Sequence, residues 1–247
     1  MARYGMVIDL SRCHGCRACM VACKVENNTP KGSFWNYVFR FEEGVFPETR
    51  VSFLPRPCMH CDNAPCVKVC PVGSRHKTLE GLTLTDWDRC IGCRYCEVAC
   101  PYGVNCFNWK DPKKNRYLDW SDPSLEGVEL SHGMPYANPD LDLPQGSQGR
   151  HTAGGGRMKG VVEKCTFCVH RLEKGLLPAC AANCPVGALV FGDLDDPESP
   201  PSQLLREKPH FRLLEGEGTE PRVYYVGGAP PTTASRQIEA VKARVER

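Results

Sequence analysis

The stretch CIGCRYCEVACP, residues 90–101, decides the fold of this chain. It contains four cysteines separated by two, two and three residues, and a proline follows the last of them. The whole chain has 247 residues and 17 cysteines, of which all but Cys106 fall into four groups of four. The groups are Cys13, Cys16, Cys19 and Cys23; Cys58, Cys61, Cys66 and Cys70; Cys90, Cys93, Cys96 and Cys100; and Cys165, Cys168, Cys180 and Cys184.

Three kinds of cysteine chemistry compete to explain these groups. Disulfides require an oxidising compartment, and three thiols this close together are too dense for three productive bridges. A zinc site takes four ligands, typically as two separated C-x-x-C pairs, and has no use for the longer run. The bacterial iron–sulfur signature is C-x2-C-x2-C-x3-C-P, and its fourth cysteine binds the other cluster of a pair. Residues 90–101 match that signature at every position, so the sequence predicts iron–sulfur clusters.

The spacing has a physical reason. Three cysteines of a group surround one cluster, and the fourth begins a helix and points toward a second cluster, so groups come in pairs. The last cysteine is followed by a proline in three groups (Pro71, Pro101 and Pro185), whereas the first group has Lys24 there.

Composition excludes several other classes of protein. The 31 basic and 29 acidic residues give a net charge of +2, without the basic excess of a nucleic-acid-binding protein. No apolar run approaches the roughly 18 residues that cross a bilayer. The opening MARYGMVIDLSRC has no apolar signal core and no twin arginine. We therefore expect the chain to have no export signal or membrane anchor of its own.

The expected fold class is α+β and loop-rich, with two interleaved two-cluster ferredoxin-like modules. Alternating residues predict strands in 3–10, 80–88, 159–165 and 187–194, and short helices are expected in 19–26, 96–103 and 169–177. A long polar loop is either functional or disordered, and we favour a partner-binding insertion. The expected units are an outer module (1–32 and 160–195), an inner module (56–110), a hairpin (33–55), the insertion (111–159) and an extended C-terminal arm (196–247).

The order and spacing of the groups resemble a known family. They resemble the electron-transfer subunit of molybdopterin oxidoreductases of the dimethyl sulfoxide reductase superfamily. The stretches YGMVIDLSRCHGCRACMVACKVEN, CMHCDNAPCVKVCPVGS and PRVYYV are similar to those of polysulfide, thiosulfate, tetrathionate, sulfite and respiratory arsenate enzymes. The resemblance spans roughly residues 3–110 and 160–226, and it is weak for the substrate, which binds on another chain.

The resemblance implies ligands that cross between groups, and four [4Fe–4S] clusters because Cys93 is intact. The implied ligand sets are Cys13, Cys16, Cys19 and Cys184; Cys165, Cys168, Cys180 and Cys23; Cys58, Cys61, Cys66 and Cys100; and Cys90, Cys93, Cys96 and Cys70.

The resemblance also implies partners and a location. A molybdopterin catalytic subunit would dock near the first cluster, and an integral membrane quinone-binding subunit near the fourth. The chain itself would be a non-catalytic relay that takes no nucleic acid and no small-molecule substrate. We expect a peripheral, membrane-associated protein. We favour a location on the external face, reached by co-export with a partner, and the cytoplasmic face is the alternative. Two alternatives are a four-cluster subunit of a hydrogenase or other non-molybdenum complex, and a non-redox metal-binding or sensor protein.

Charge around the clusters is a further expectation. Each cluster with four thiolates carries about −2 when oxidised, and charge is one of the levers on its potential. We expect Lys24, Lys68 and Arg94 to offset that charge. Cys106, the cysteine outside the groups, is expected to be a buried free thiol.

Metal analysis tests the cluster hypothesis directly. We expect about sixteen iron and about sixteen acid-labile sulfide per chain after anaerobic purification, four of each for every cluster. Stoichiometric zinc without labile sulfide would contradict the hypothesis.

Overall fold

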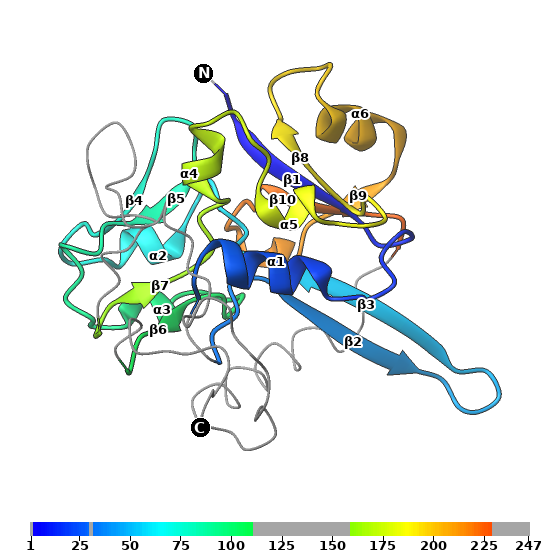
Figure 1. The fold of residues 1–247 in the computed structure, drawn as a ribbon, viewed down its shortest axis with the longest axis horizontal. Coiled ribbons are helices and arrows are strands. Elements are labelled where there is room, and N and C mark those ends of the chain that lie inside the picture. Colours follow the sequence, from blue (N-terminus) through cyan, green and yellow to red (C-terminus); the bar gives the residue numbers. More distant parts are fainter. Residues whose placement is uncertain (1, 30–31, 111–158, 229–247) are drawn as a thin grey trace, which may run out of the picture.

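The computed structural model describes residues 2–29, 32–110 and 159–228 (Figure 1). The strands are β1 (Tyr4–Asp9), β2 (Tyr37–Glu43), β3 (Arg50–Arg56), β4 (Arg75–Lys77), β5 (Thr83–Thr85), β6 (Cys106–Phe107), β7 (Val162–Glu163), β8 (Leu189–Asp193), β9 (His210–Phe211) and β10 (Val223–Val226). The helices are α1 (Ala18–Glu26), α2 (Pro65–Lys68), α3 (Tyr95–Val98), α4 (Val169–Leu172), α5 (Ala179–Ala182) and α6 (Pro200–Glu207), followed by a 3-10 turn (Glu215–Glu217).

A four-stranded sheet joins the two ends of the described chain. Its strand order is β8-β1-β10-β9, with β1 parallel to β10 and antiparallel to β8. Strand β1 is flanked on both sides, and Met6, Val7 and Ile8 are fully buried. This burial explains the apolar run at the start of the sequence, because a strand in the middle of a sheet can be covered on both faces.

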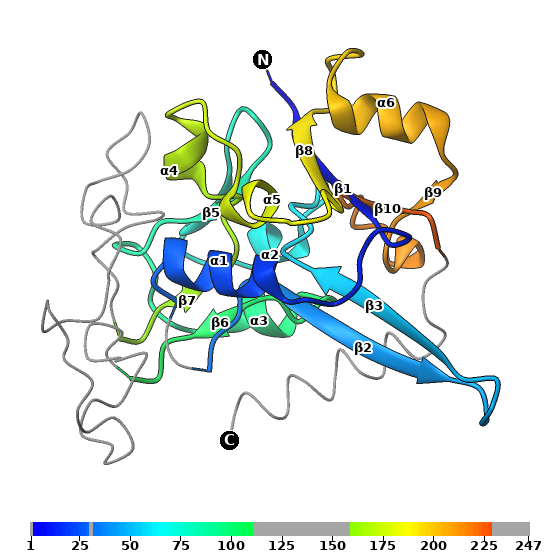
Figure 2. The ribbon, with the colours of Figure 1, turned by 45° about the vertical axis from the view of Figure 1, so that its right-hand side comes forward.

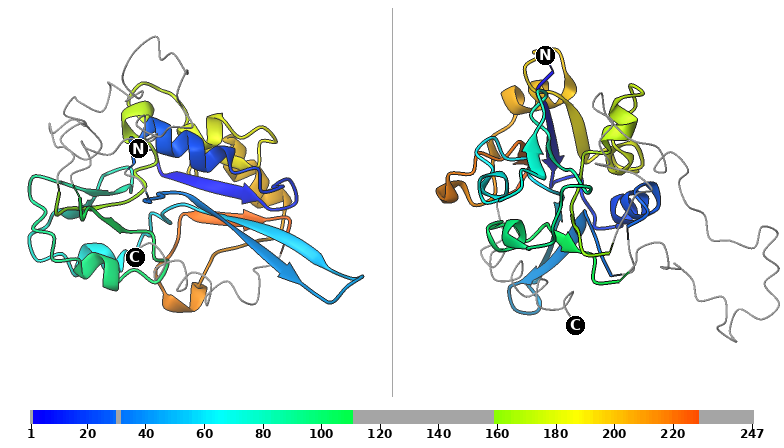
Figure 3. Two further views of the ribbon diagram at one scale, coloured as in Figure 1. Left: turned by 60° about the horizontal axis from the view of Figure 1, so that its bottom comes forward. Right: turned by 90° about the vertical axis from the view of Figure 1, so that its left-hand side faces the viewer.

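A two-stranded hairpin projects from the body of the molecule (Figures 1 and 2). Strands β2 and β3 pair from Tyr37 with Arg56 to Glu43 with Arg50, within the region where the sequence predicts a hairpin. Trp35 anchors its base in the core, whereas Val45 and Phe46 at the tip are 82% and 87% exposed. The left panel of Figure 3 shows how far the tip extends beyond the other elements.

Two pairs of short helices form the framework around the cysteines. Helix α1 packs on α5, and α2 packs on α3, although the partners come from distant segments. Helix α2 begins with Pro65 at its first turn, where the fixed φ of proline suits a helix start. Each of these helices carries the third cysteine of a group, so helix packing controls where the thiols lie.

The loops of the first and third groups adopt the same backbone conformations. Gly15 and Gly92 have φ of +72° and +70°, and Arg17 and Arg94, two residues later, have φ of +63° and +61°. A Cβ on Gly92 would lie 2.1 Å from the carbonyl oxygen of Gly160, so glycine is required there for space as well as conformation.

The structure departs from the sequence predictions in three places. The fourth cysteine of a group does not begin a helix: Cys23 lies inside α1, and Cys70, Cys100 and Cys184 follow α2, α3 and α5. Helices α3 and α4 have four residues each, shorter than the segments 96–103 and 169–177. Residues 196–228 do not form an extended arm: they contain α6, and β9 and β10 complete the central sheet. The sequence could not reveal this because β10 is held by pairing with β1, more than two hundred residues away in the chain. The rest of the arm and almost all of the insertion lie outside the described residues.

A comparison of two glycines tests the close approach at Gly92. Gly92→Ala and Gly73→Ala both place a side chain at positive φ, which costs about 1–2 kcal/mol. Only Gly92→Ala also forces a Cβ against backbone, because nothing lies within 4 Å of a Cβ on Gly73. We expect visible cluster absorbance to bleach faster on heating in Gly92→Ala than in Gly73→Ala. Equal rates would show that this approach does not restrict the loop.

Candidate metal centres

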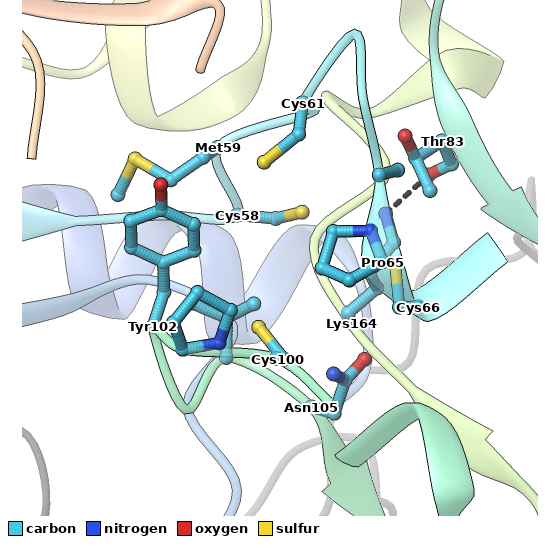
Figure 4. Close-up of a pocket in the computed structure, with 13 residues that line it drawn as sticks. Cys58, Met59, Cys61, Pro65, Cys66, Thr83, Cys100, Tyr102, Asn105 and Lys164 are labelled. Carbon is cyan, nitrogen blue, oxygen red and sulfur yellow. Dashed lines mark hydrogen bonds between the residues drawn. The ribbon is translucent and has the colours of Figure 1, made fainter. Parts of the chain in front are cut away.

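The third thiol set surrounds a cavity in the inner part of the chain. Cys58, Cys61, Cys66 and Cys100 line this cavity, and all four are buried. Cys66 lies in α2, and Cys100 follows α3, so the packing of these helices brings the second and third cysteine groups together. Figure 4 shows the four side chains around the space, with Lys164 and Asn105 at its side.

The fourth thiol set lines a second cavity. It consists of Cys70, Cys90, Cys93 and Cys96, and Cys93 is exposed. Both cavities therefore take three cysteines from one group and one from the other.

The first thiol set combines Cys13, Cys16 and Cys19 with Cys184. Burial is the main cause of the raised pKa of Cys19, about 12, and the nearby thiols of Cys13, Cys184 and Cys16 add to it. Cys184 reaches this set because α5, just before it in the chain, packs on α1. Cys16 is exposed to solvent.

The second thiol set combines Cys165, Cys168 and Cys180 with Cys23. Burial raises the pKa of Cys23, and the thiols of Cys165 and Cys168 are the next causes. The side-chain amide of Asn27 donates to both Sγ of Cys168, at 3.5 Å, and Sγ of Cys23, at 3.7 Å. One buried amide thus joins a thiol of the first group to a thiol of the fourth group. Asn27 and Cys168 are 141 residues apart along the chain.

Backbone amides point at several of these sulfur atoms. The amides of His60, Arg75, Phe167 and Ala188 donate to Sγ of Cys58, Cys70, Cys165 and Cys184, at 3.5, 3.3, 3.4 and 3.2 Å. Such donors favour the thiolate form and are one of the levers on cluster potential.

The buried cysteines are thiols, not thiolates, before metal binds. Burial raises the pKa of Cys61 and Cys165 to about 12 and that of Cys66 to about 11. They are therefore protonated at neutral pH without metal, and metal binding must release those protons.

The geometry suits a cluster better than a single ion. Among the described residues, no three cysteine, histidine or acidic side chains gather closely enough to hold one metal ion. The thiols instead surround spaces, as ligands to the corners of a larger inorganic core do. All cysteines lie in the described residues and none forms a disulfide.

Comparison with known proteins agrees with this arrangement. Two families, each described as a 4Fe-4S dicluster domain, match the chain, one over residues 49–116 and 155–194 and the other over residues 12–74. Two dicluster domains correspond to four [4Fe–4S] clusters, the cofactors predicted from the sequence.

Relatives match almost the whole chain. The arsenate respiratory reductase iron–sulfur subunit of Shewanella sp. (strain ANA-3) is 46% identical over 229 residues, covering 91% of this chain and 96% of that protein. A putative dimethyl sulfoxide reductase iron–sulfur subunit of Halobacterium salinarum is 41% identical (92% and 80% covered). The iron–sulfur cluster-binding subunit of the menaquinone reductase of Nitratidesulfovibrio vulgaris is 39% identical (91% and 88% covered).

The chain belongs to the iron–sulfur subunits of the molybdopterin oxidoreductases. The resemblance stated from the motifs is confirmed, and so is a non-catalytic, electron-transferring role. No helix in the described part of this iron–sulfur subunit has the length and apolar character needed to cross a membrane.

The basic residues expected to offset cluster charge differ in where they lie, and Arg94 lines the cavity of the fourth thiol set. The Lys24 ammonium donates to the carbonyl oxygens of Thr29 and Ser33. Lys68 is exposed, and Arg94 forms an ion pair with Glu97 and stacks over Trp109.

Three further cations that lie at the thiols are buried, and the sequence analysis did not identify them. Arg56, Arg75 and Lys164 are buried beside the third set, and they come from β3, β4 and the residue after β7. No motif marks them, because each lies outside the cysteine spacing and is brought there by the fold.

Cys106 lies apart from both cavities. It is in β6, paired with Glu163 of β7. Burial is the main cause of its pKa of about 11, and Glu163 adds to it while Arg56 acts the other way. It is a protonated thiol at neutral pH.

Proposed function

We propose that this subunit carries electrons along four clusters in the order of the four thiol sets. The proposed ligands are the first set (Cys13, Cys16, Cys19 and Cys184), the second (Cys165, Cys168, Cys180 and Cys23), the third (Cys58, Cys61, Cys66 and Cys100) and the fourth (Cys90, Cys93, Cys96 and Cys70). Bound clusters supply one-electron redox chemistry, and the protein supplies their order, burial and charge. The first two sets would form the outer module and the last two the inner module.

The distribution of exposure carries this proposal. Cys16 of the first set and Cys93 of the fourth are exposed, whereas every cysteine of the second and third sets is buried. A relay requires this pattern, because its end sites exchange electrons with partners and its middle sites exchange them only with each other.

Contacts between neighbouring sets support the same order. Cys19 adds to the raised pKa of Cys23, after burial and closer thiols, which links the first set to the second. Cys58 is the second cause, after burial, of the raised pKa of Cys165, which links the third set to the second. The rings of His60 and Phe167 stack at 3.9 Å between the loops of these two sets.

The surroundings of the fourth set support a membrane subunit as the partner at this end. Ile91, Tyr95 and Trp109 are exposed close to this set in the chain, and Ile91 lines its cavity beside Val72. Exposed apolar side chains are typical of a surface that another protein covers when they form one patch, which is the arrangement we propose here. The name of the menaquinone reductase relative supports a quinone as the electron partner there.

The other end of the relay would meet the catalytic subunit. We propose a molybdopterin subunit docked near Cys16, in a respiratory oxidoreductase for a sulfur or arsenic compound, as the names of arsenate and tetrathionate reductase relatives support. The complex would be peripheral to the membrane through this chain, on the external face if the catalytic partner carries the export signal. A non-molybdenum complex is the second candidate, because one relative is named as a subunit of an Hdr-like menaquinol oxidoreductase. The chains that co-purify with this subunit distinguish the two.

Replacement of one crossing ligand tests the proposed sets. In Cys184→Ser we expect the electron paramagnetic resonance signal of the first cluster to change, because Cys184 interacts with Cys13 and Cys19. The cluster of Cys165, Cys168 and Cys180 should keep its wild-type spectrum. The reverse result would show that the cysteines pair within their own groups.

Replacement of the exposed ligand of the fourth set tests which end of the relay exchanges electrons with quinone. In an assembled Cys93→Ala complex, we expect electron exchange with quinone to be lost, and activity with a dye that reaches the catalytic subunit directly to be retained. Cys106→Ala is the matched control, since Cys106 lies outside all four sets, and it should keep both activities. Normal quinone turnover in Cys93→Ala would mean that electrons leave elsewhere.

A further inference from the structure

Three buried cations around the third thiol set lack a carboxylate partner. Arg56, Arg75 and Lys164 are 4%, 2% and 2% exposed. In residues 2–29, 32–110 and 159–228, no ion pair includes any of the three. Burial of an unpaired cation is costly, so a structure that holds three of them together must supply negative charge in another form.

Lys164 lies between the third and second sets. It lines the cavity of the third set, and its ammonium donates to the carbonyl oxygen of Thr83 (Figure 4). The same ammonium donates to the carbonyl oxygen of Cys165 at 2.9 Å. Both acceptors are neutral. Burial raises the pKa of Cys66 and of Cys165, and the charge of Lys164 lowers both.

Arg75 lies between the third and fourth sets. Its Nη2 donates to Sγ of Cys96 at 3.3 Å and to Oδ1 of Asn105 at 2.8 Å. Its Nε and Nη1 are buried without a hydrogen-bond partner among the described residues. Burial raises the pKa of Cys66, and among the charges that lower this pKa, that of Arg75 has the largest effect.

Arg56 completes the group on the side of Cys100. Its guanidinium donates to the carbonyl oxygens of Tyr102 and Gly103 and lies 5.0 Å from the ring centre of Phe39. Its electrostatic partners include Cys100, Cys106 and Cys58.

The carboxylates of this region have other partners. Glu163 accepts a hydrogen bond from Asn108, and Glu97 pairs with Arg94. Asp62 forms ion pairs with Arg3, Lys77 and Arg222. None of these carboxylates forms a described ion pair with the three cations, whereas Arg75 donates to a cysteine sulfur, that of Cys96.

We propose that Arg56, Arg75 and Lys164 form a cation cage that keeps the third cluster reducible, an inference that rests on the proposed ligand sets. A cluster with four buried thiolates gains a further negative charge on reduction, and burial without solvent lowers its potential. Fixed cations at the thiolates oppose that effect, since charge and exposure are levers on cluster potential. The cage also links three sites, because Lys164 borders the second set and Arg75 borders the fourth.

Potentiometric titration of the assembled complex, with each cluster followed by electron paramagnetic resonance, tests the cage. Lys164→Met and Arg75→Gln should each lower the reduction equilibrium constant of the third cluster at least tenfold, a shift of about 59 mV for one electron. The second cluster should shift as well in Lys164→Met only, and the fourth in Arg75→Gln only. Lys164→Arg and Arg75→Lys, which keep the charge, should stay near the wild-type potential.

Lys68→Gln is the matched control, because Lys68 is two residues from Cys66 in sequence but exposed. It should leave all four potentials unchanged. An iron-loaded Lys164→Met or Arg75→Gln complex with an unchanged third potential, or with equal shifts in all four clusters, would overturn the cage. Both neutral variants could instead lose four iron atoms per chain while the charge-keeping variants retain them. That result would show that the cations are needed to hold the cluster charge, and it would support the cation cage. A wild-type chain with no cluster at the third set would instead refute the proposed function.

Discussion

The packing of one cysteine-bearing helix on another from a distant segment is the constraint on which the structure depends. Helices α2, α3, α4 and α5 have four residues each, too few to persist alone in water. The pairs α1 with α5 and α2 with α3 are stable only as parts of the whole, and each pair brings thiols from two groups together. Cluster binding and folding are therefore coupled, as in other small proteins whose core is built on metal ligands.

Charge is the second constraint. Four oxidised clusters at about −2 each would convert the formal +2 of the sequence to about −6. At the first and fourth sets, solvent reaches Cys16 and Cys93 and screens part of that charge. At the third set no cysteine is exposed, and buried cations lie there instead. Solvent at the ends and cations in the middle are two ways to stabilise the same charge.

The sequence predicted the cysteine groups, the hairpin and the first strand because each depends on local pattern. Spacing within a group reflects one loop around one core, and β1 and β2–β3 follow from apolar residues close together in the chain. The buried cations were missed because β3, β4 and the residue after β7 bring them together only in three dimensions. Helix α6 and the pairing of β10 were missed for the same reason: Val223–Val226 is a strand because β1 lies beside it.

The junction between the second and third sets shows what this arrangement demands of ordinary side chains. His60 and Phe167 each follow a C-x sequence inside a cysteine loop, both have positive φ, and their rings stack at 3.9 Å. Burial, with the nearby Lys164, Lys77 and Arg222 cations, holds the pKa of His60 well below its usual value, so the ring is neutral. A charged imidazole would add to three cations already close by, whereas a neutral ring packs against Phe167 and accepts a hydrogen bond from the Thr83 amide. The junction thus keeps its rings neutral for packing, and its positive charge lies on the neighbouring lysine and arginine side chains.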